Sequence, residues 1–141
     1  MLIRILLVFG LLLSVATEAK ECSKYEAFAA ESVTDYLNNW HNLHLAFKQF
    51  GHCDDGAIGE GLSEAVARLL VDQWPTFSEL VSYSSKEPGF EKFVLAHIDE
   101  TVTSEDLVKI HEYANTRCPA NAKALCQKIV AASTTSTVPV K

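Results

Sequence analysis

The residues of this chain that could most readily do chemistry lie together in the run 51–56, Gly-His-Cys-Asp-Asp-Gly. His52, Asp54 and Asp55 place an imidazole beside two carboxylates, and Glu60 follows shortly after. Such groups could act as general acid and base in a small hydrolase, or could bind a divalent ion. The alternating acidic positions of a calcium loop are absent, because the two aspartates are adjacent. We favour a structural interpretation, in which the aspartates stabilise the start of a helix through its dipole.

A second group of candidate residues is formed by the other histidines. His41 and His44 are three residues apart, and His97 and His111 lie on later apolar stripes. Imidazoles from neighbouring helices could together bind zinc or copper. None of the spacings matches a known metal motif, so we expect each ring to lie in or beside the core with one hydrogen-bond partner. We therefore expect no catalytic residue, metal or cofactor, and keep these four histidines as a metal-binding alternative.

The four cysteines indicate disulfide bonds. Their number is even, and no C-x-x-C pair is present to suggest a zinc knuckle or a redox site. The set consists of Cys22, Cys53, Cys118 and Cys126.

Residues 1–19 have the pattern of a secretory signal peptide. A positive charge at Arg4 precedes a short apolar run, and small residues then offer cleavage sites after Ala16 or Ala19. The apolar run falls short of the ~20 residues that a membrane-spanning helix needs. We therefore expect a protein exported to the periplasm or beyond it, with no stable membrane anchor.

The charge of the chain limits its partners. There are 18 acidic and 12 basic side chains, a formal net charge of −6, and no run of Lys or Arg. This composition disfavours binding to nucleic acid or to an anionic membrane surface.

The elements that would position these residues are helices, because apolar residues recur every three or four positions and no segment alternates as a strand does. Thr76 and Thr103 have the spacing of helix caps, and 84–89 is expected to be a connector. The predicted helices cover 25–50, 54–74, 76–81, 90–101, 103–114 and 122–130. The sequence thus predicts an all-α, disulfide-stabilised, irregular bundle of about five or six helices. It also predicts a single helical domain over 20–132 and a disordered tail over 133–141.

The disulfide pairing follows from the length of the first predicted helix. A continuous helix from Tyr25 to Lys48 would be about 36 Å long at 1.5 Å per residue. Cys22 and Cys53 would then lie far beyond the ~7 Å Cα separation that a disulfide spans. We therefore expect Cys53 to pair with Cys118 or Cys126.

Many aromatic residues fall at helical spacing. They could line a cavity for a small apolar ligand, which would make the protein a carrier. We expect them to form the core instead, as large apolar side chains usually do. The residues are Phe28, Tyr36, Trp40, Phe47, Phe50, Trp74, Phe77, Phe90 and Phe93.

Three segments carry a resemblance to other proteins: CDDGAIGEGLSEAVARLLVDQW (53–74), FEKFVLAHIDET (90–101) and CPANAKALCQKI (118–129). Together they resemble small exported helical proteins of Gram-negative bacteria that have no assigned activity. In size, export, helices and disulfides the chain is also distantly similar to periplasmic immunity proteins, which is an analogy at the level of architecture. The resemblance implies a helical domain and no catalytic residues.

We therefore expect an exported, non-enzymatic protein that binds another macromolecule in the periplasm, as an inhibitor or immunity-type protein does. The charged residues His52, Asp54, Asp55 and Glu60 are the expected interaction surface. The alternatives are a carrier of a small apolar ligand or metal, and a small hydrolase that uses the first three of these residues.

Overall fold

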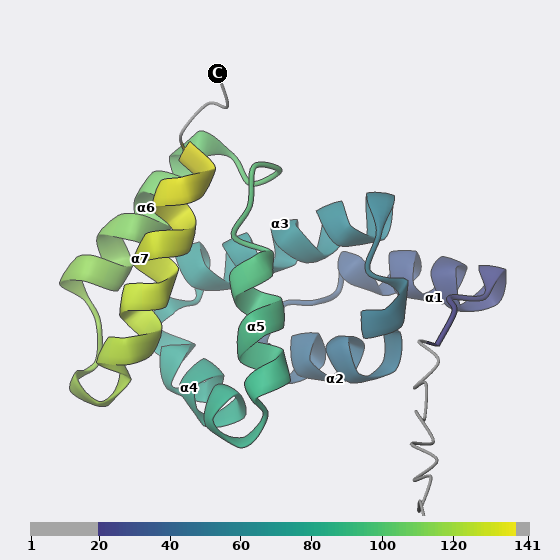
Figure 1. Ribbon diagram of the computed structural model, residues 1–141, viewed down its shortest axis with the longest axis horizontal. Coiled ribbons are helices and arrows are strands. Elements are labelled where there is room, and N and C mark those ends of the chain that lie inside the picture. Colours follow the sequence, from purple (N-terminus) through teal and green to yellow (C-terminus); the bar gives the residue numbers. More distant parts are fainter. Residues whose placement is uncertain (1–19, 138–141) are drawn as a thin grey trace, which may run out of the picture.

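The computed structural model describes residues 20–137, which form seven α-helices, three short 3-10 helices and no strand. The α-helices are α1 (Lys24–Thr34), α2 (Trp40–Phe50), α3 (Gly56–Asp72), α4 (Phe77–Lys86), α5 (Pro88–Ala96), α6 (Ser104–Thr116) and α7 (Lys123–Thr137). The 3-10 helices are η1 (Gly51–Cys53), η2 (Trp74–Thr76) and η3 (Ala120–Ala122). In Figure 1, α6 and α7 run side by side at one end of the molecule, α1 lies at the other end, and α3 extends between them. The prediction of an all-α fold stabilised by disulfides is confirmed.

Polar side chains define where several helices begin. The Ser23 hydroxyl accepts a hydrogen bond from the Glu26 backbone N–H, and the Glu26 side chain accepts one from the Ser23 backbone N–H. Asp55 caps α3, and Thr103 caps α6 as predicted. Thr76 is different, because its hydroxyl donates to the Gln73 carbonyl and forms no side-chain cap for α4. The cap predicted at Thr76 is therefore wrong.

The single helix predicted over 25–50 is also wrong, because the helix is interrupted between α1 and α2. Asn39 starts the second helix by accepting a hydrogen bond from the Asn42 backbone N–H at 2.8 Å. Leu37 and Trp40 on either side of the break are both buried, at 3% and 1% exposure. The apolar spacing therefore continues across the break, although the backbone does not continue as a helix.

This break reverses the predicted disulfide pairing. Because α2 folds back on α1, the Cα atoms of Cys22 and Cys53 are 4.9 Å apart and the two cysteines form a disulfide. A second disulfide joins Cys118 to Cys126, with Cα atoms 6.1 Å apart across the turn that contains η3. The predicted pairing of Cys53 with Cys118 or Cys126 is wrong, since it rested on a straight first helix.

The C-terminal end of the predicted domain differs from expectation, and so does the predicted connector. Helix α7 continues to Thr137, so the disordered tail predicted from Ser133 onward is wrong as far as Thr137. Ser133 is fully buried, and the Ser136 hydroxyl donates to the Ile98 carbonyl at 2.8 Å. The rest of that tail and the predicted signal peptide lie outside the described residues. The connector predicted over 84–89 is mostly helical, because α4 ends at Lys86 and α5 begins at Pro88.

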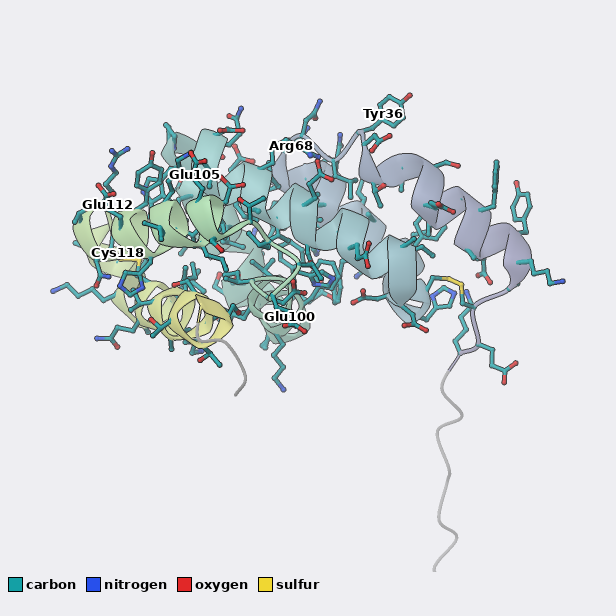
Figure 2. The ribbon with its side chains drawn as sticks, turned by 90° about the horizontal axis from the view of Figure 1, so that it is seen from above. Tyr36, Arg68, Glu100, Glu105, Glu112 and Cys118 are labelled. Carbon is teal, nitrogen blue, oxygen red and sulfur yellow. A yellow bond between two sulfur atoms is a disulfide. The ribbon has the colours of Figure 1, made fainter. Side chains whose placement is uncertain are left out.

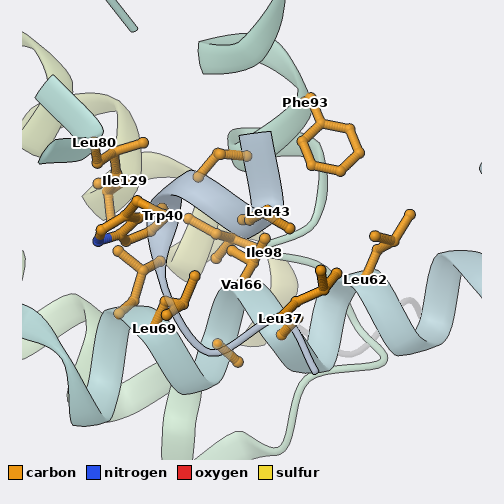
Figure 3. Packing of buried hydrophobic residues seen from close by; sticks show 14 of the residues in the cluster. Leu37, Trp40, Leu43, Leu62, Val66, Leu69, Leu80, Phe93, Ile98 and Ile129 are labelled. Carbon is orange, nitrogen blue, oxygen red and sulfur yellow. The ribbon is translucent and has the colours of Figure 1, made fainter. Parts of the chain in front are cut away.

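A continuous apolar core holds these helices together. Figure 3 shows Trp40 and Leu43 of α2 packed near Val66 and Leu69 of α3 and Ile129 of α7. Burial of one such side chain contributes about 1.5–3 kcal/mol. Two of the residues predicted for this core, Phe28 and Tyr36, are instead 72% exposed. Between residues 20 and 137, no helix is long and apolar enough to cross a membrane.

The contact of α1 with α3 leaves no room for a side chain at Gly61. A Cβ atom there would lie 2.9 Å from the side-chain atoms of Thr34, which is buried in the interface. Threonine is branched at Cβ and has few rotamers, so it cannot move aside without moving the backbone. Gly61 therefore sets how closely α1 approaches α3.

We predict that Gly61→Ala lowers the free energy of unfolding by about 1–3 kcal/mol, as overpacking does. This loss would outweigh the ~1 kcal/mol by which alanine normally stabilises a helix relative to glycine. Gly89→Ala in α5 is the matched control, because its Cβ would lie 3.6 Å from Phe47, an ordinary contact distance. Urea denaturation should find the control equal to or more stable than the wild type. A Gly61→Ala protein as stable as the control would contradict this account.

Candidate functional site

The predicted acid–base cluster is divided among three different contacts. His52 Nε2 lies 3.2 Å from Glu26 Oε1, which links η1 to the start of α1. Asp54 Oδ1 lies 3.1 Å from His97 Nε2 at the end of α5. Asp55 Oδ1 accepts a hydrogen bond from the Gly56 backbone N–H at 2.8 Å. Each side chain is thus directed to a structural partner of its own.

Asp54 and His97 form a hydrogen-bonded contact at the edge of the core. The His97 ring is 4% exposed, and its Nδ1 atom lies 2.8 Å from the Phe93 carbonyl. Both partners of the ring offer acceptor oxygens, so the two contacts are satisfied when both ring nitrogens carry protons. The His97 ring, held between a carboxylate and a carbonyl, joins α5 to the loop before α3.

Ser63 is held by a carboxylate. Its hydroxyl is buried and donates to Asp99 Oδ2 at 2.9 Å, while Asp99 Oδ1 accepts from the backbone N–H and hydroxyl of Thr101. Burial raises the pKa of Asp99, but the hydrogen bonds from Thr101 and Ser63 outweigh burial and leave that pKa below its ordinary value. The lowered pKa makes Asp99 a weak base for activating a serine nucleophile, and the Ser63 hydroxyl instead joins α3 to the segment before α6.

The remaining histidines each contact side chains outside their own helix. His44 Nε2 lies 2.6 Å from Glu87 Oε2, and its ring stacks on Tyr83 with centroids 4.5 Å apart. His41 contacts the Tyr83 hydroxyl, and His111 lies near the Ser133 hydroxyl. Across residues 20–137, no group of three or more His, Cys, Asp or Glu side chains is arranged to hold a metal ion. The four histidines of the metal-binding alternative are therefore not brought together.

Most of the aromatic rings pack against one another in the core. Phe90 contacts Phe47, Phe93 and Tyr83, with ring centroids 5.5–6.1 Å apart. Trp74 stacks on Phe77 at 4.5 Å. These rings contribute packing energy to the core, which is the interpretation that the sequence favoured over a ligand cavity.

Glu26 is the centre of the polar contacts around the first disulfide. Its carboxylate contacts Lys20 Nζ at 2.7 Å, the Ser23 hydroxyl at 2.7 Å and His52. The hydrogen bond from Lys20, followed by those from Ser23, lowers the pKa of Glu26 from 4.5 to about 2. The carboxylate is therefore ionised at any ordinary pH and holds the start of α1 against η1.

The surface that could bind a partner is a groove between α3 and the segment that leads into α6. Its volume is about 670 Å³. Small residues, including Ala57 and Ala67, leave the space open. We call this surface the acidic groove; its charged lining residues are Glu60, Glu64, Asp72, Asp106, Arg68 and Lys109. Arg68 and Glu105, which lies beside the groove, are labelled in Figure 2.

The carboxylates of the acidic groove exceed its cations. Arg68 lies 3.4 Å from Glu64, and Lys109 lies 2.8 Å from Glu105, so both cations already have acidic partners within the chain. Glu60 and Asp72 form no ion pair with another side chain in the described part of the protein. The groove therefore offers unbalanced negative charge to a ligand.

The sequence pointed to only one residue of this groove. Glu60 belonged to the predicted interaction surface, whereas the rest of that surface, at residues 52–55, is used in structural contacts. The missed signal is a charged residue at every fourth position of α3, at 60, 64, 68 and 72. This spacing places all four on one face of the helix.

We predict that Glu26 makes stability depend on pH in the acid range. Its folded pKa of about 2 lies below the ordinary 4.5, so the ionised carboxylate stabilises the fold above pH 4.5. This contribution is lost as the pH falls toward 2. Glu26→Gln should therefore be less stable than the wild type at pH 7, and the difference should shrink as urea denaturation is repeated at lower pH. A difference that stays constant from pH 7 to pH 3 would contradict the assignment.

Comparison with known proteins gives no match: no family model, curated protein or solved structure is similar to this chain.

Proposed function

We propose that this is an exported, non-enzymatic protein that binds a basic segment of another macromolecule in the periplasm. The observation that carries the proposal is the acidic groove, where four carboxylates face two cations that are already paired within the chain. A volume of about 670 Å³ lies in the range of natural ligand sites and accommodates one or two Lys or Arg side chains of a partner.

Electrostatics favour such a partner over a neutral one. The chain has a net charge of −6, which attracts a basic molecule before contact and raises the association rate. Within the groove, Glu60 and Asp72 are exposed and lack ion-pair partners among the described residues, so little is lost when they bind a cation. A guanidinium group could form two hydrogen bonds with one carboxylate, which adds specificity.

Export and the absence of catalysis are parts of the same proposal. Two disulfides fit an oxidising compartment, and residues 1–19 have the pattern of a signal peptide. Of the candidate acid–base residues, His52 and Asp54 contact other helices and Asp55 caps α3, so binding is favoured over hydrolysis. An inhibitor or immunity-type role rests on likeness in size, helices and disulfides alone.

Site-specific photocrosslinking in the native host tests the proposal. A photoreactive amino acid at Ala57, which is exposed in the groove, should give a defined adduct with a basic protein. The same amino acid at Ala124, exposed on α7, is the control and should not give this adduct. The double variant Glu60→Gln/Asp72→Asn should abolish the adduct without changing the circular dichroism spectrum.

Three results would overturn the proposal. The first is no adduct at Ala57, and the second is the same adducts at Ala57 and Ala124. The third is an adduct that survives the double neutralisation and also survives high salt, where exposed charges are screened within about 3 Å.

A further inference from the structure

Helix α1 is apolar on two opposite sides. Its inner side packs on α3 through Ala30 and Thr34, which are buried. Its outer side carries Tyr25, which is 82% exposed, and Phe28, which is 72% exposed. A surface helix normally places polar residues on its outer side, so exposed rings of this size are unusual.

Two more exposed apolar side chains, Tyr36 and Leu45, lie beyond the end of α1 and on α2. Positions 25 and 28 lie one turn apart on α1, and Tyr36, which is 72% exposed, lies two residues beyond the end of α1. Figure 2 shows the Tyr36 side chain projecting away from the helices. Leu45 of α2 is 50% exposed and lines the same hollow as Tyr36. We call Tyr25, Phe28, Tyr36 and Leu45 the aromatic row.

At one end of the aromatic row the side chains project from the surface. At the other end the surface is hollow. Tyr25 and Phe28 stand out from the first turns of α1. The hollow at the other end has a volume of about 230 Å³ and a mainly apolar lining that includes Val33, Leu37 and Phe50. A two-fold axis across α1 would place the raised rings of each copy against the hollow of the other, which is the self-complementary arrangement of a symmetric dimer.

The charges beside the aromatic row select the same arrangement. At 100° per residue, Lys24, Glu31 and Asp35 lie along one flank of the row, with the positive charge at the start of α1 and the negative charges at its end. None of the three forms an ion pair with another described side chain. Antiparallel pairing of two α1 helices would bring Lys24 of each copy opposite the acidic end of the other.

We propose that the aromatic row is the contact surface of a homodimer, in which the α1 helices of two copies pack antiparallel. Helix α1 alone is about 16 Å long, which is short for an interface that typically buries ~800 Å² per partner. The hollow on α2 supplies the additional apolar area. The aromatic row shares no residue with the acidic groove, so this inference does not depend on the proposed function.

Sedimentation equilibrium of the oxidised protein tests the dimer. The wild type should change from monomer to dimer over about a hundredfold range of concentration. Phe28→Ser should weaken the dimer about a hundredfold, as loss of a buried aromatic contact does. Lys24→Glu should weaken it about tenfold, and Lys123→Glu on α7, with the same change of charge, should have no effect.

Exchanging these charges distinguishes a specific dimer from nonspecific association. Lys24→Glu makes all three charges beside the aromatic row negative, and Glu31→Lys/Asp35→Lys makes all three positive. A mixture of these two variants should form a heterodimer more readily than either variant forms a homodimer, and circular dichroism should show that both remain folded.

Three results would overturn the inference. They are a wild type that stays monomeric over the whole range, a dimer unaffected by Phe28→Ser, and a mixture of the two charge variants that forms no heterodimer. A monomeric chain whose aromatic row crosslinks to a different protein would assign this surface to that protein instead.

Discussion

The arrangement of the first three helices depends on the disulfide between Cys22 and Cys53. It closes a loop of 31 residues that contains α1 and α2, which stabilises the fold by about 4 kcal/mol in the chain-entropy description. The contacts of Glu26 with Lys20 and His52 lie beside this bond and hold the same junction. With its start fixed in this way, α1 can pack closely on Gly61 of α3 while its outer side remains exposed. The aromatic row is therefore presented on a firmly attached helix.

The sequence predicted the helices well because the core repeats with helical spacing. A cap at Asp54 or Asp55 and one at Thr103 were recognisable, since such side chains satisfy backbone N–H groups that would otherwise lack partners. The break between α1 and α2 was not predictable from spacing, because Leu37 and Trp40 both point into the core and keep the apolar pattern in phase. The asparagines there were visible as poor helix formers, but only the structure shows that Asn39 starts a new helix. The error in disulfide pairing followed directly from that missed break.

Function was harder to predict because the type of a residue does not show which way its side chain points. His52, Asp54 and Asp55 are neighbours in the sequence, yet a turn sends their side chains to three different partners. Phe28 and Tyr36 match the apolar period of the core as well as buried residues do, and only the position of α3 shows that they face outward. The acidic groove combines α3 with residues 101–109, which come well after it in the chain, so most of its lining could not be assigned from local patterns. What remained visible was the net negative charge, which indicates the kind of partner but not where it binds.

The disulfide pairing is the central claim, and peptide mapping without reduction tests it most directly. Trypsin should release the peptide 21–24 joined to 49–68, and the peptide 118–123 joined to 124–128. These two linked pairs are what the folded-back first helix and the tight turn at η3 require. Recovery of 49–68 joined to 118–123 or to 124–128 would contradict the account, because α1 would then have no covalent attachment to η1 and its two surfaces would not be held in place.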